Sequence, residues 1–381
     1  MTRRNKAQRN LKTDARMTPY DVKVKGTFAE PPKKEKLPPR KPTSEEQRAN
    51  NLAPVEFSRE SASVGNWIPL FRKELAEMNS GKVGRPYSFC DSMIVWIISL
   101  QTLIKGTYRT AAGLAAAILE GHGMEAPSYS RLFERSAEML DRMLSENGGT
   151  YIIRAGSNVI DSPRNVGIDS SGFNLSNTCL WRKEKWGTGP KRRGWLKLHV
   201  LSDVDTGEVI AFAVTDKNTG DSPLMIPLLD AAVAAGHRIG TVYADGAYSS
   251  AENFDHVCGR LGTRFVTSFK VNTKPVNGGS RYRGEATRLW CSMPYSEWVE
   301  KSGYGRRWKS ECGFSDVKRL FGESIHAFTM KGAVRKLLMK TETFSRYKEQ
   351  RAILLSGCLA SSRCRHRFWQ QSLLRVNYRT L

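Results

Sequence analysis

Three acidic residues in this 381-residue chain have the types and settings that divalent-metal chemistry requires. Asp169 lies in GIDSSG, Asp245 lies in YADGAY, and Glu311 lies in a segment rich in cations. Carboxylate oxygens are the ligands that hard cations such as Mg²⁺ prefer, and a pair of such ions can promote phosphodiester displacement. The alternative is that an Asp at a strand end caps a turn. We expect the three carboxylates to converge, with nearby acids as possible substitutes for one of them: Asp161, Asp216 and Asp221.

The segment around Glu311 has the spacing Y-x2-R-x3-E-x6-K, formed with Tyr304, Arg307 and Lys318. At about 100° per residue these four side chains share one helix face, provided that the helix reaches back to Tyr304. A carboxylate flanked by cations could hold a metal ion while the cations hold phosphates. The alternative is an i, i+4 Arg–Glu surface pair with an unrelated Lys. The four-residue pattern favours the first interpretation.

Alternating and amphipathic patterns predict the elements that must position these acids. The first strand carries Asp169, the fourth ends at Asp245, and the last helix carries Glu311. This order predicts an RNase H-like mixed sheet with flanking helices, in which the first and fourth strands are neighbours. In chain order the predicted strands are 165–175, 196–202, 209–215, 241–244 and 263–270, and the predicted helices are 222–235, 250–261 and 307–321.

An all-helical region precedes the sheet. The run from Met93 to Ile104 is too short to span a membrane and predicts a buried helix. Helices at 110–120 and 128–144, joined by a Gly-containing turn, are typical of a helix-turn-helix. The second helix would present Arg131 and Arg135 to DNA, although helix pairs also occur in ordinary cores.

The charge balance indicates a polyanionic partner. Lys and Arg number 60 against 37 Asp and Glu, which gives a net charge of +23. Hydrophobic residues make up 40% of the chain, which excludes a wholly disordered protein. Residues 1–20 lack a signal-peptide pattern, and the seven cysteines are scattered without a C-x-x-C pair, so we expect a reduced, cytoplasmic, nucleoid-associated protein.

A second basic segment lies between the first two predicted strands. Its cations Lys191, Arg192 and Arg193 are interleaved with tryptophans, a combination that could hold phosphates and stack on bases. The alternative is a solvated hairpin tip.

Taken together, the GIDSSG, YADGAY and Y-R-E-K motifs resemble those of insertion-sequence DDE transposases of the Y-R-E-K group. The resemblance extends over about residues 84–345 and includes TDKNTGDSPLMIPLL at 215–229. It implies that Asp169, Asp245 and Glu311 are catalytic ligands of two Mg²⁺ ions, which Mn²⁺ could replace. It also implies that Tyr304, Arg307 and Lys318 contact the terminal nucleotides and phosphates.

The resemblance further implies hydrolysis of an element end, followed by attack of the freed 3′-OH on target DNA. The expected partners are double-stranded DNA, as terminal inverted repeats and target, and a second copy of the chain, with no membrane. The larger transposases of this family carry a base-stacking tryptophan, which has no clear counterpart in this sequence. Trp290 and Trp298 are candidates, and the alternative is that they pack in the core. The alternatives are an RNase H-like nuclease that cuts without joining and a sequence-specific repressor whose acids are structural.

We therefore predict four regions. The first is a basic, disordered tail, the second a helical DNA-binding domain, the third the catalytic domain with a short insert at about 271–303, and the fourth a basic C-terminal segment. Their ranges are 1–59, 60–150, 160–345 and 346–381.

Overall fold

A mixed β-sheet forms the centre of the computed structural model. The structure describes residues 43, 44, 47, 51–54, 57, 58, 64–142, 145–147, 150–154, 161–175, 195–270, 272–275, 279–327 and 329–355. All of them belong to one unit, Pro38–Leu381. Most of the predicted tail, the end of the predicted C-terminal segment and the predicted DNA-binding cations Lys191, Arg192 and Arg193 lie outside these residues.

The five central strands follow one another along the chain in the order that the sequence predicted. Strand β3 is antiparallel to β4, which is antiparallel to β5, whereas β6 and β7 continue the sheet in parallel on the other side of β3. The first and fourth predicted strands, β3 and β6, are therefore neighbours, and the predicted α/β class with a mixed sheet and flanking helices is confirmed. The bounds are β3 Arg164–Leu175, β4 Trp195–Asp203, β5 Val209–Asp216, β6 Ile239–Ala244 and β7 Arg264–Thr267.

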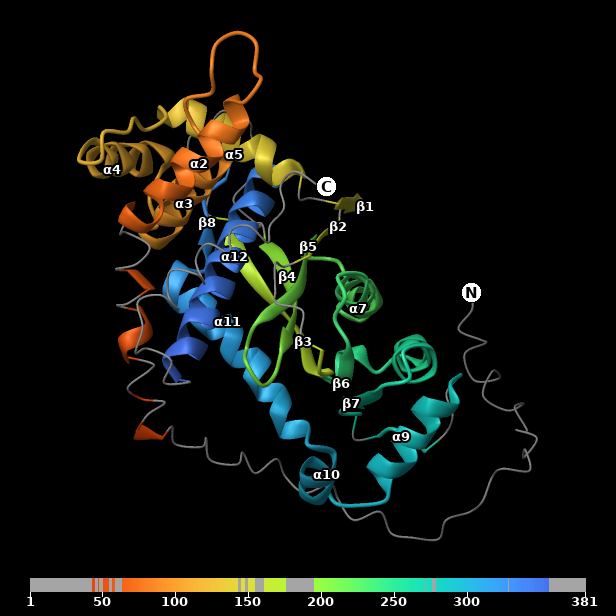
Figure 1. Ribbon diagram of the computed structural model, residues 1–381. Helices are drawn as coiled ribbons and strands as arrows, with labels where there is room; N and C mark the ends of the chain where they lie inside the picture. The colour runs from red at the N-terminus through yellow and green to blue at the C-terminus, as the bar shows by residue number, and fades with distance from the viewer. Residues whose placement is uncertain are drawn as a thin grey trace, which may run out of the picture. The chain divides into compact units, whose positions relative to one another are not determined.

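Each face of the sheet buries its own apolar cluster, because successive side chains of a strand point to opposite faces. On β5, Ala211 and Ala213 contribute to one cluster, and Phe212 and Val214 contribute to the other. Helix α7 (Met225–Ala234) covers the first face, and helices α11 (Trp308–Phe321) and α12 (Met330–Leu355) cover the second (Figure 1).

Several elements were not predicted from the sequence. Strands β1 (Ser145–Asn147) and β2 (Thr150–Arg154) extend the sheet beyond β5, and the two-residue strand β8 (Ser324–Ile325) pairs with the end of β3. The long helix α12 also went unpredicted, and it crosses the predicted boundary near residue 345. Its mixed composition gives only a weak amphipathic signal, and its burial comes from contacts with distant elements.

The segment between β7 and α11 is helical where the structure describes it. It contains α9 (Arg281–Cys291), α10 (Tyr295–Ser302) and a 3-10 turn, η5 (Tyr304–Arg307), that leads into α11. Before β7, α8 (Ala251–Phe254) continues into a π-helical turn, η4 (Asp255–Arg260).

The region before the sheet is built from helices, as predicted. Helix α3 is buried over most of its length, which confirms the interpretation of its apolar run, and no helix among the described residues is long and apolar enough to span a membrane. Side chains of α3 share one apolar cluster with α11, α12 and the sheet. The helical region therefore packs as part of the same core. Its helices are α2 (Ile68–Asn79), α3 (Asp91–Leu103), α4 (Tyr108–Glu120) and α5 (Tyr129–Arg142).

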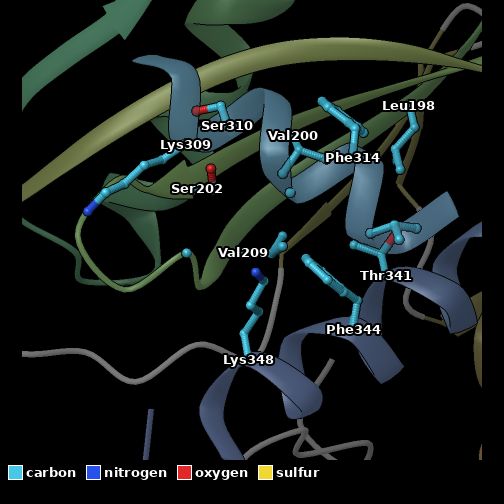
Figure 2. Close-up of a pocket in the computed structure, with 13 residues that line it drawn as sticks. Leu198, Val200, Ser202, Val209, Lys309, Ser310, Phe314, Thr341, Phe344 and Lys348 are labelled. Carbon is cyan, nitrogen blue, oxygen red and sulfur yellow. The ribbon is translucent and has the colours of Figure 1, made fainter. Parts of the chain in front are cut away.

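A small cavity of about 30 Å³ lies between α11, α12 and strands β4 and β5 (Figure 2). Apolar side chains such as Val200, Phe314 and Phe344 surround it, with Lys309 and Lys348 at its margin. Space for roughly one water-sized probe shows that α11 packs closely on the sheet.

Candidate active site

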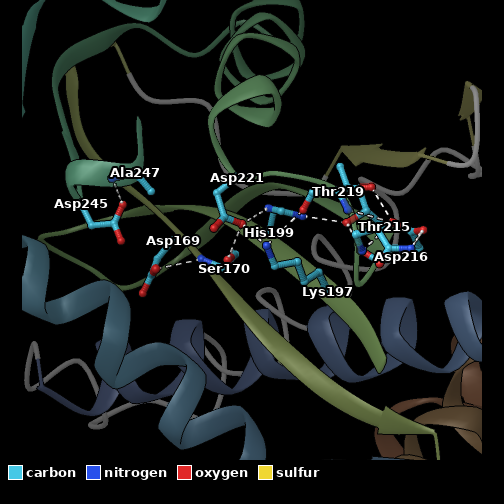
Figure 3. Close-up of polar contacts among 11 residues, drawn as sticks. Asp169, Ser170, Lys197, His199, Thr215, Asp216, Thr219, Asp221, Asp245 and Ala247 are labelled. Carbon is cyan, nitrogen blue, oxygen red and sulfur yellow. Dashed lines mark hydrogen bonds and ion pairs between the residues drawn. The ribbon is translucent and has the colours of Figure 1, made fainter. Parts of the chain in front are cut away.

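Strand register places two of the predicted acids next to each other. In the parallel pair β3–β6, Gly167 is opposite Tyr243, and continuing that register by two residues brings Asp169 beside Asp245. Asp245 follows the last residue of β6, and its Oδ1 accepts a hydrogen bond from the backbone N–H of Ala247 at 2.9 Å. Asp245 thus caps a turn, as the alternative interpretation proposed, and also lies at the edge of the sheet that holds Asp169 (Figure 3).

Helix α11 brings the third acid to the same place. A Cβ atom at Gly167 would collide with the Ser310 hydroxyl, so the helix crosses β3 at a point that tolerates only glycine. Since side chains alternate along a strand, Asp169 points to the same face as Gly167, toward α11. Glu311, the neighbour of Ser310, lies in the first turn of this helix.

The electrostatics of Asp169 show that the three carboxylates influence one another. Burial, together with the charges of Asp245 and Glu311, raises the pKa of Asp169 to about 6. The N–H of Ser170 and the charge of Arg307 act in the opposite direction. A buried carboxyl among other carboxylates is a place where negative charge lacks full compensation.

Arg307 connects this cluster to the cationic part of the motif. Its guanidinium donates to Glu311 Oε1 at 2.6 Å and lies 5.4 Å from the Tyr304 ring centroid. The Arg307 side chain is only 18% exposed, and its Nε has no hydrogen-bond partner among the described atoms. The i, i+4 pair considered as the alternative exists, but the arginine is mostly buried beside Asp169 and is no ordinary surface cation.

The α-helix that was expected to carry all four motif residues is shorter than predicted. The α-helix begins at Trp308, and Tyr304 belongs to the preceding 3-10 turn, so the condition that the helix reach back to Tyr304 is not met. Tyr304 is buried against Trp298, and its hydroxyl donates to Ser268 Oγ at 3.0 Å. Lys318 lies about two helical turns beyond Glu311 on α11, with its Nζ 5.4 Å from the Phe173 ring centroid.

A polar network behind Asp169 was missed at the level of sequence. Asp221 Oδ1 accepts hydrogen bonds from Ser170 Oγ at 2.8 Å and from Lys197 Nζ at 2.7 Å, and buried His199 approaches the same oxygen at 3.6 Å (Figure 3). Ser170 also donates its N–H to Asp169 Oδ1 at 2.9 Å, so it joins the network to the cluster. The available signal was the pair of polar residues, Lys197 and His199, inside the otherwise apolar strand β4.

The possible substitutes for a ligand occupy other roles. Asp216 is exposed and accepts hydrogen bonds from the N–H groups of Asn218 and Thr219 in its own turn. Asp221 is engaged by Lys197, and the backbone carbonyl of Asp161 accepts from Arg238.

The remaining predicted contacts lie outside this cluster. On α5, Arg131 is exposed and pairs with Glu134 at 3.2 Å, whereas Arg135 is largely buried and pairs with Asp91 at 2.5 Å. Of the two candidate stacking residues, Trp298 is 4% exposed, and Trp290 packs against it with ring centroids 4.6 Å apart. Trp298 therefore belongs to the core.

The fold and the site together define a class: an α/β domain that brings three carboxylates, flanked by an arginine, to one edge of a mixed sheet. Residues 161–341 match the family model of the transposase DDE domain. This part of the chain is therefore a transposase DDE domain, which confirms the resemblance to insertion-sequence DDE transposases. The match does not extend to the Y-R-E-K group, which stays a prediction.

A more distant likeness is found among solved structures. A chain in the cryoEM structure of the simian T-cell lymphotropic virus intasome in complex with PP2A regulatory subunit B56 gamma is 17% identical, with a TM-score of 0.21. The match covers 54% of this chain and 66% of that chain. The family assignment depends on the matched domain alone.

Proposed function

We propose that the protein is a transposase that cleaves the ends of its insertion element and joins the freed 3′-OH to target DNA. The observation that carries the proposal is that the charges of Asp245 and Glu311 act on the buried Asp169 inside a transposase DDE domain. Double-stranded DNA is the proposed partner, and the net charge of +23 supports it. Because two element ends must be held together, a homodimer on DNA is part of the proposal.

The donor set fits a pair of divalent cations. Around Asp169 the charges that raise its pKa are carboxylates, and oxygen ligands of this kind suit Mg²⁺ or Mn²⁺. In the described part of the chain no three acidic, His or Cys side chains are close enough to hold one ion between them. A pair of ions held by three carboxylates does not need such a cluster, because each ion would bind only one or two of the carboxylates. Water and DNA oxygens would supply the remaining ligands.

When bound, the ions supply Lewis-acid activation of the attacking oxygen and stabilisation of the leaving oxygen. Asp169, Asp245 and Glu311 would hold them, which requires Asp169 to be deprotonated. Ser170 orients Asp169 through its N–H, while Arg307 orients Glu311 by a charge-assisted hydrogen bond.

The cations of the motif have distinct parts in DNA binding. Arg307 combines burial with an unpartnered Nε, so it is placed to meet a phosphate next to the cluster. Lys318 would contact a phosphate farther along α11. The Tyr304 ring packs against the guanidinium of Arg307. For Tyr304 to contact a terminal nucleotide, as predicted, its buried hydroxyl would have to give up its hydrogen bond to Ser268.

The test is cleavage and joining of the element's own ends, which inverted repeats flanking the reading frame would identify. We expect the full-length protein with Mg²⁺ to cut these ends and to insert precut ends into a plasmid. Asp169→Asn and Glu311→Gln should each lower both rates by at least about 100-fold, because a lost ligand costs several kcal/mol of transition-state stabilisation.

DNA binding by these variants should stay near the wild-type level, since dispersed phosphate contacts supply most of the affinity. Asp216→Asn is the matched control, because this acid serves only its own exposed turn and should leave activity unchanged. Cleavage without joining would identify a nuclease, and binding without either reaction would identify a repressor. Full activity in Asp169→Asn would refute the assignment of the site.

A further inference from the structure

A second cavity, of about 210 Å³, lies away from the three carboxylates. One wall is the connection between α3 and α4, a second is the end of α11 with β8, and the third is the first half of α12. Neither the acidic cluster nor the Asp221 network contributes to its lining. The cavity thus joins the helical region to the DDE domain at a place that the proposed chemistry does not use.

The lining has an excess of positive charge. Its basic side chains are Lys105, Arg335, Lys336 and Lys340, whereas Glu323 is its one acid. Arg335 is neutralised by Asp141 of α5 through two hydrogen bonds, of 2.8 and 2.5 Å. The three lysines form no ion pair in the part of the chain that the structure describes.

Two of these ammonium groups are fixed by backbone carbonyls and still keep donors. Lys340 Nζ donates to the carbonyls of Gly322 at 2.7 Å and Ser324 at 3.0 Å, and Lys336 Nζ donates to the carbonyl of His326. Each ammonium has three N–H groups, so at least one remains on each lysine. Burial, together with repulsion from Lys336 and Lys105, lowers the pKa of Lys340 to about 8.

Covering the carbonyls at the end of a helix is a common role for lysines, and it explains part of this arrangement. It does not explain Lys105, which comes from a different element and is bonded to no carbonyl of α11. Lys105 is also the one non-glycine residue with a positive φ, 54°, among the described residues. This φ belongs to the turn that ends α3, in which the N–H of Lys105 donates to the carbonyl of Thr102. The turn places Lys105 at the same cavity as the two lysines of α12.

We propose that this cavity binds a phosphate group, with Lys105, Lys336 and Lys340 as its cationic ligands. The volume is several times the roughly 30 Å³ that one water molecule occupies in the liquid, so a phosphate with part of its substituent fits. A bound phosphate would hold the α3–α4 connection against α12. Its source is either the backbone of DNA or a free small phosphate compound, and this inference does not depend on the proposed transposase activity.

Binding is tested with pyrophosphate as the probe and the full-length protein, by calorimetry at constant ionic strength set with NaCl. We expect saturable binding and a rise in Tm beyond that given by NaCl alone. Lys105→Gln and Lys336→Gln should each weaken the Kd by about tenfold, the value of one charge-assisted contact. Lys331→Gln, an exposed position on the same helix α12, is the matched control and should bind as the wild type does.

Lys105→Gln keeps the test decisive even if Lys336→Gln folds poorly, because the Lys105 side chain has no hydrogen bond recorded in the structure to lose. An equal Kd in the wild type and in Lys105→Gln would overturn the proposal, as would the absence of binding above the NaCl reference.

DNA binding across salt concentrations then identifies the source of the phosphate. The salt slope is the change in log K for DNA binding with log salt concentration. If this slope is smaller by about 1 in magnitude in the Lys105→Gln/Lys336→Gln variant, the site holds a DNA phosphate. If the slope is unchanged while pyrophosphate binding is lost, the ligand is a free phosphate compound.

Discussion

At the scale of single residues, the pleat of β3 directs neighbouring side chains to opposite faces of the sheet, where they have different roles. Asp169 points toward α11 and the other carboxylates, while the next side chain, Ser170, points to the opposite face and to Asp221. Ser170 is bonded to both acids, through its N–H and its hydroxyl. Asp169, the proposed catalytic acid, is therefore oriented through Ser170 by a network that includes two buried or half-buried basic residues, His199 and Lys197.

His199 makes this network sensitive to acid. Burial lowers the pKa of His199 to about 4, so the folded protein keeps a neutral ring where the unfolded chain binds a proton near pH 6.5. Stability attributable to His199 is complete above pH 6.5 and is lost as the pH falls toward 4, by up to about 3 kcal/mol. Asp221, whose pKa the hydrogen bonds from Lys197 and Ser170 hold below its ordinary value, faces the ring together with Lys197.

Urea unfolding of the wild type and of His199→Gln at pH 7.5 and pH 4.5 measures this contribution. We expect the wild type to lose about 2–3 kcal/mol more than the variant between the two pH values. Equal losses in the two proteins would show that His199 is not held neutral by the fold.

At the scale of elements, α11 depends on two glycines with opposite requirements. Gly303 ends α10 with φ 72°, a left-handed conformation that precedes the 3-10 turn of Tyr304. Gly313 lies inside α11 without positive φ, and a Cβ atom there would meet no heavy atom within 4 Å. Only the first glycine has a conformational reason to be there.

We therefore expect Gly313→Ala to raise the free energy of unfolding by about 0.5–1 kcal/mol, through better helix propensity. Gly303→Ala should lower it by about 1 kcal/mol or more, because alanine resists the left-handed region in which Gly303 lies, with φ 72°. Chemical denaturation of both variants checks the contrast. A destabilised Gly313→Ala would mean that α11 has no room at this position.

At the scale of the whole molecule, the helical region and the DDE domain share one core. Residues of α3 pack in the same cluster as those of α12, and Arg335 of α12 is bonded to Asp141 of α5. An isolated fragment of about residues 60–148 would lose these contacts. DNA readout by the proposed helix pair is therefore best tested in the full-length chain.

The two arginines of α5 should respond differently to truncation. Arg131→Ala removes an exposed side chain and should reduce discrimination between element-end and random DNA by about 1–3 kcal/mol if it meets a base. Arg135→Ala removes the partner of Asp91 and should lower stability by about 1–3 kcal/mol. Competition binding and urea unfolding of both variants separate the effects, and unchanged discrimination in Arg131→Ala would leave the helix pair as core only.

The cations Lys191, Arg192 and Arg193, changed together to Ala, should act on every DNA sequence alike. Phosphate contacts carry no sequence information, so affinity should fall uniformly and the salt slope should decrease by up to about 3. Binding isotherms for end and random DNA over a range of salt concentrations measure it. A loss confined to element-end DNA would contradict a phosphate role.

Local periodicity was enough to predict the order of the central strands, the helix that carries Glu311 and the buried helix of the Met93–Ile104 run. Each of these depends on residues near one another in the chain, where alternation or a 3.6-residue repeat reports directly on burial. The same reasoning missed the change of helix type at Tyr304, where a 3-10 turn stands in place of the first turn expected of an α-helix.

Only the tertiary structure decided which distant residues meet. The crossing of α11 over Gly167, the Asp221 network, the place of α12 in the shared core and the lysine-lined cavity all join elements far apart in sequence. No local pattern encodes such contacts, because each depends on strand register and helix packing that many residues determine together. The sequence therefore determined which side chains are available for chemistry, and the packing of the elements determined which of them are neighbours.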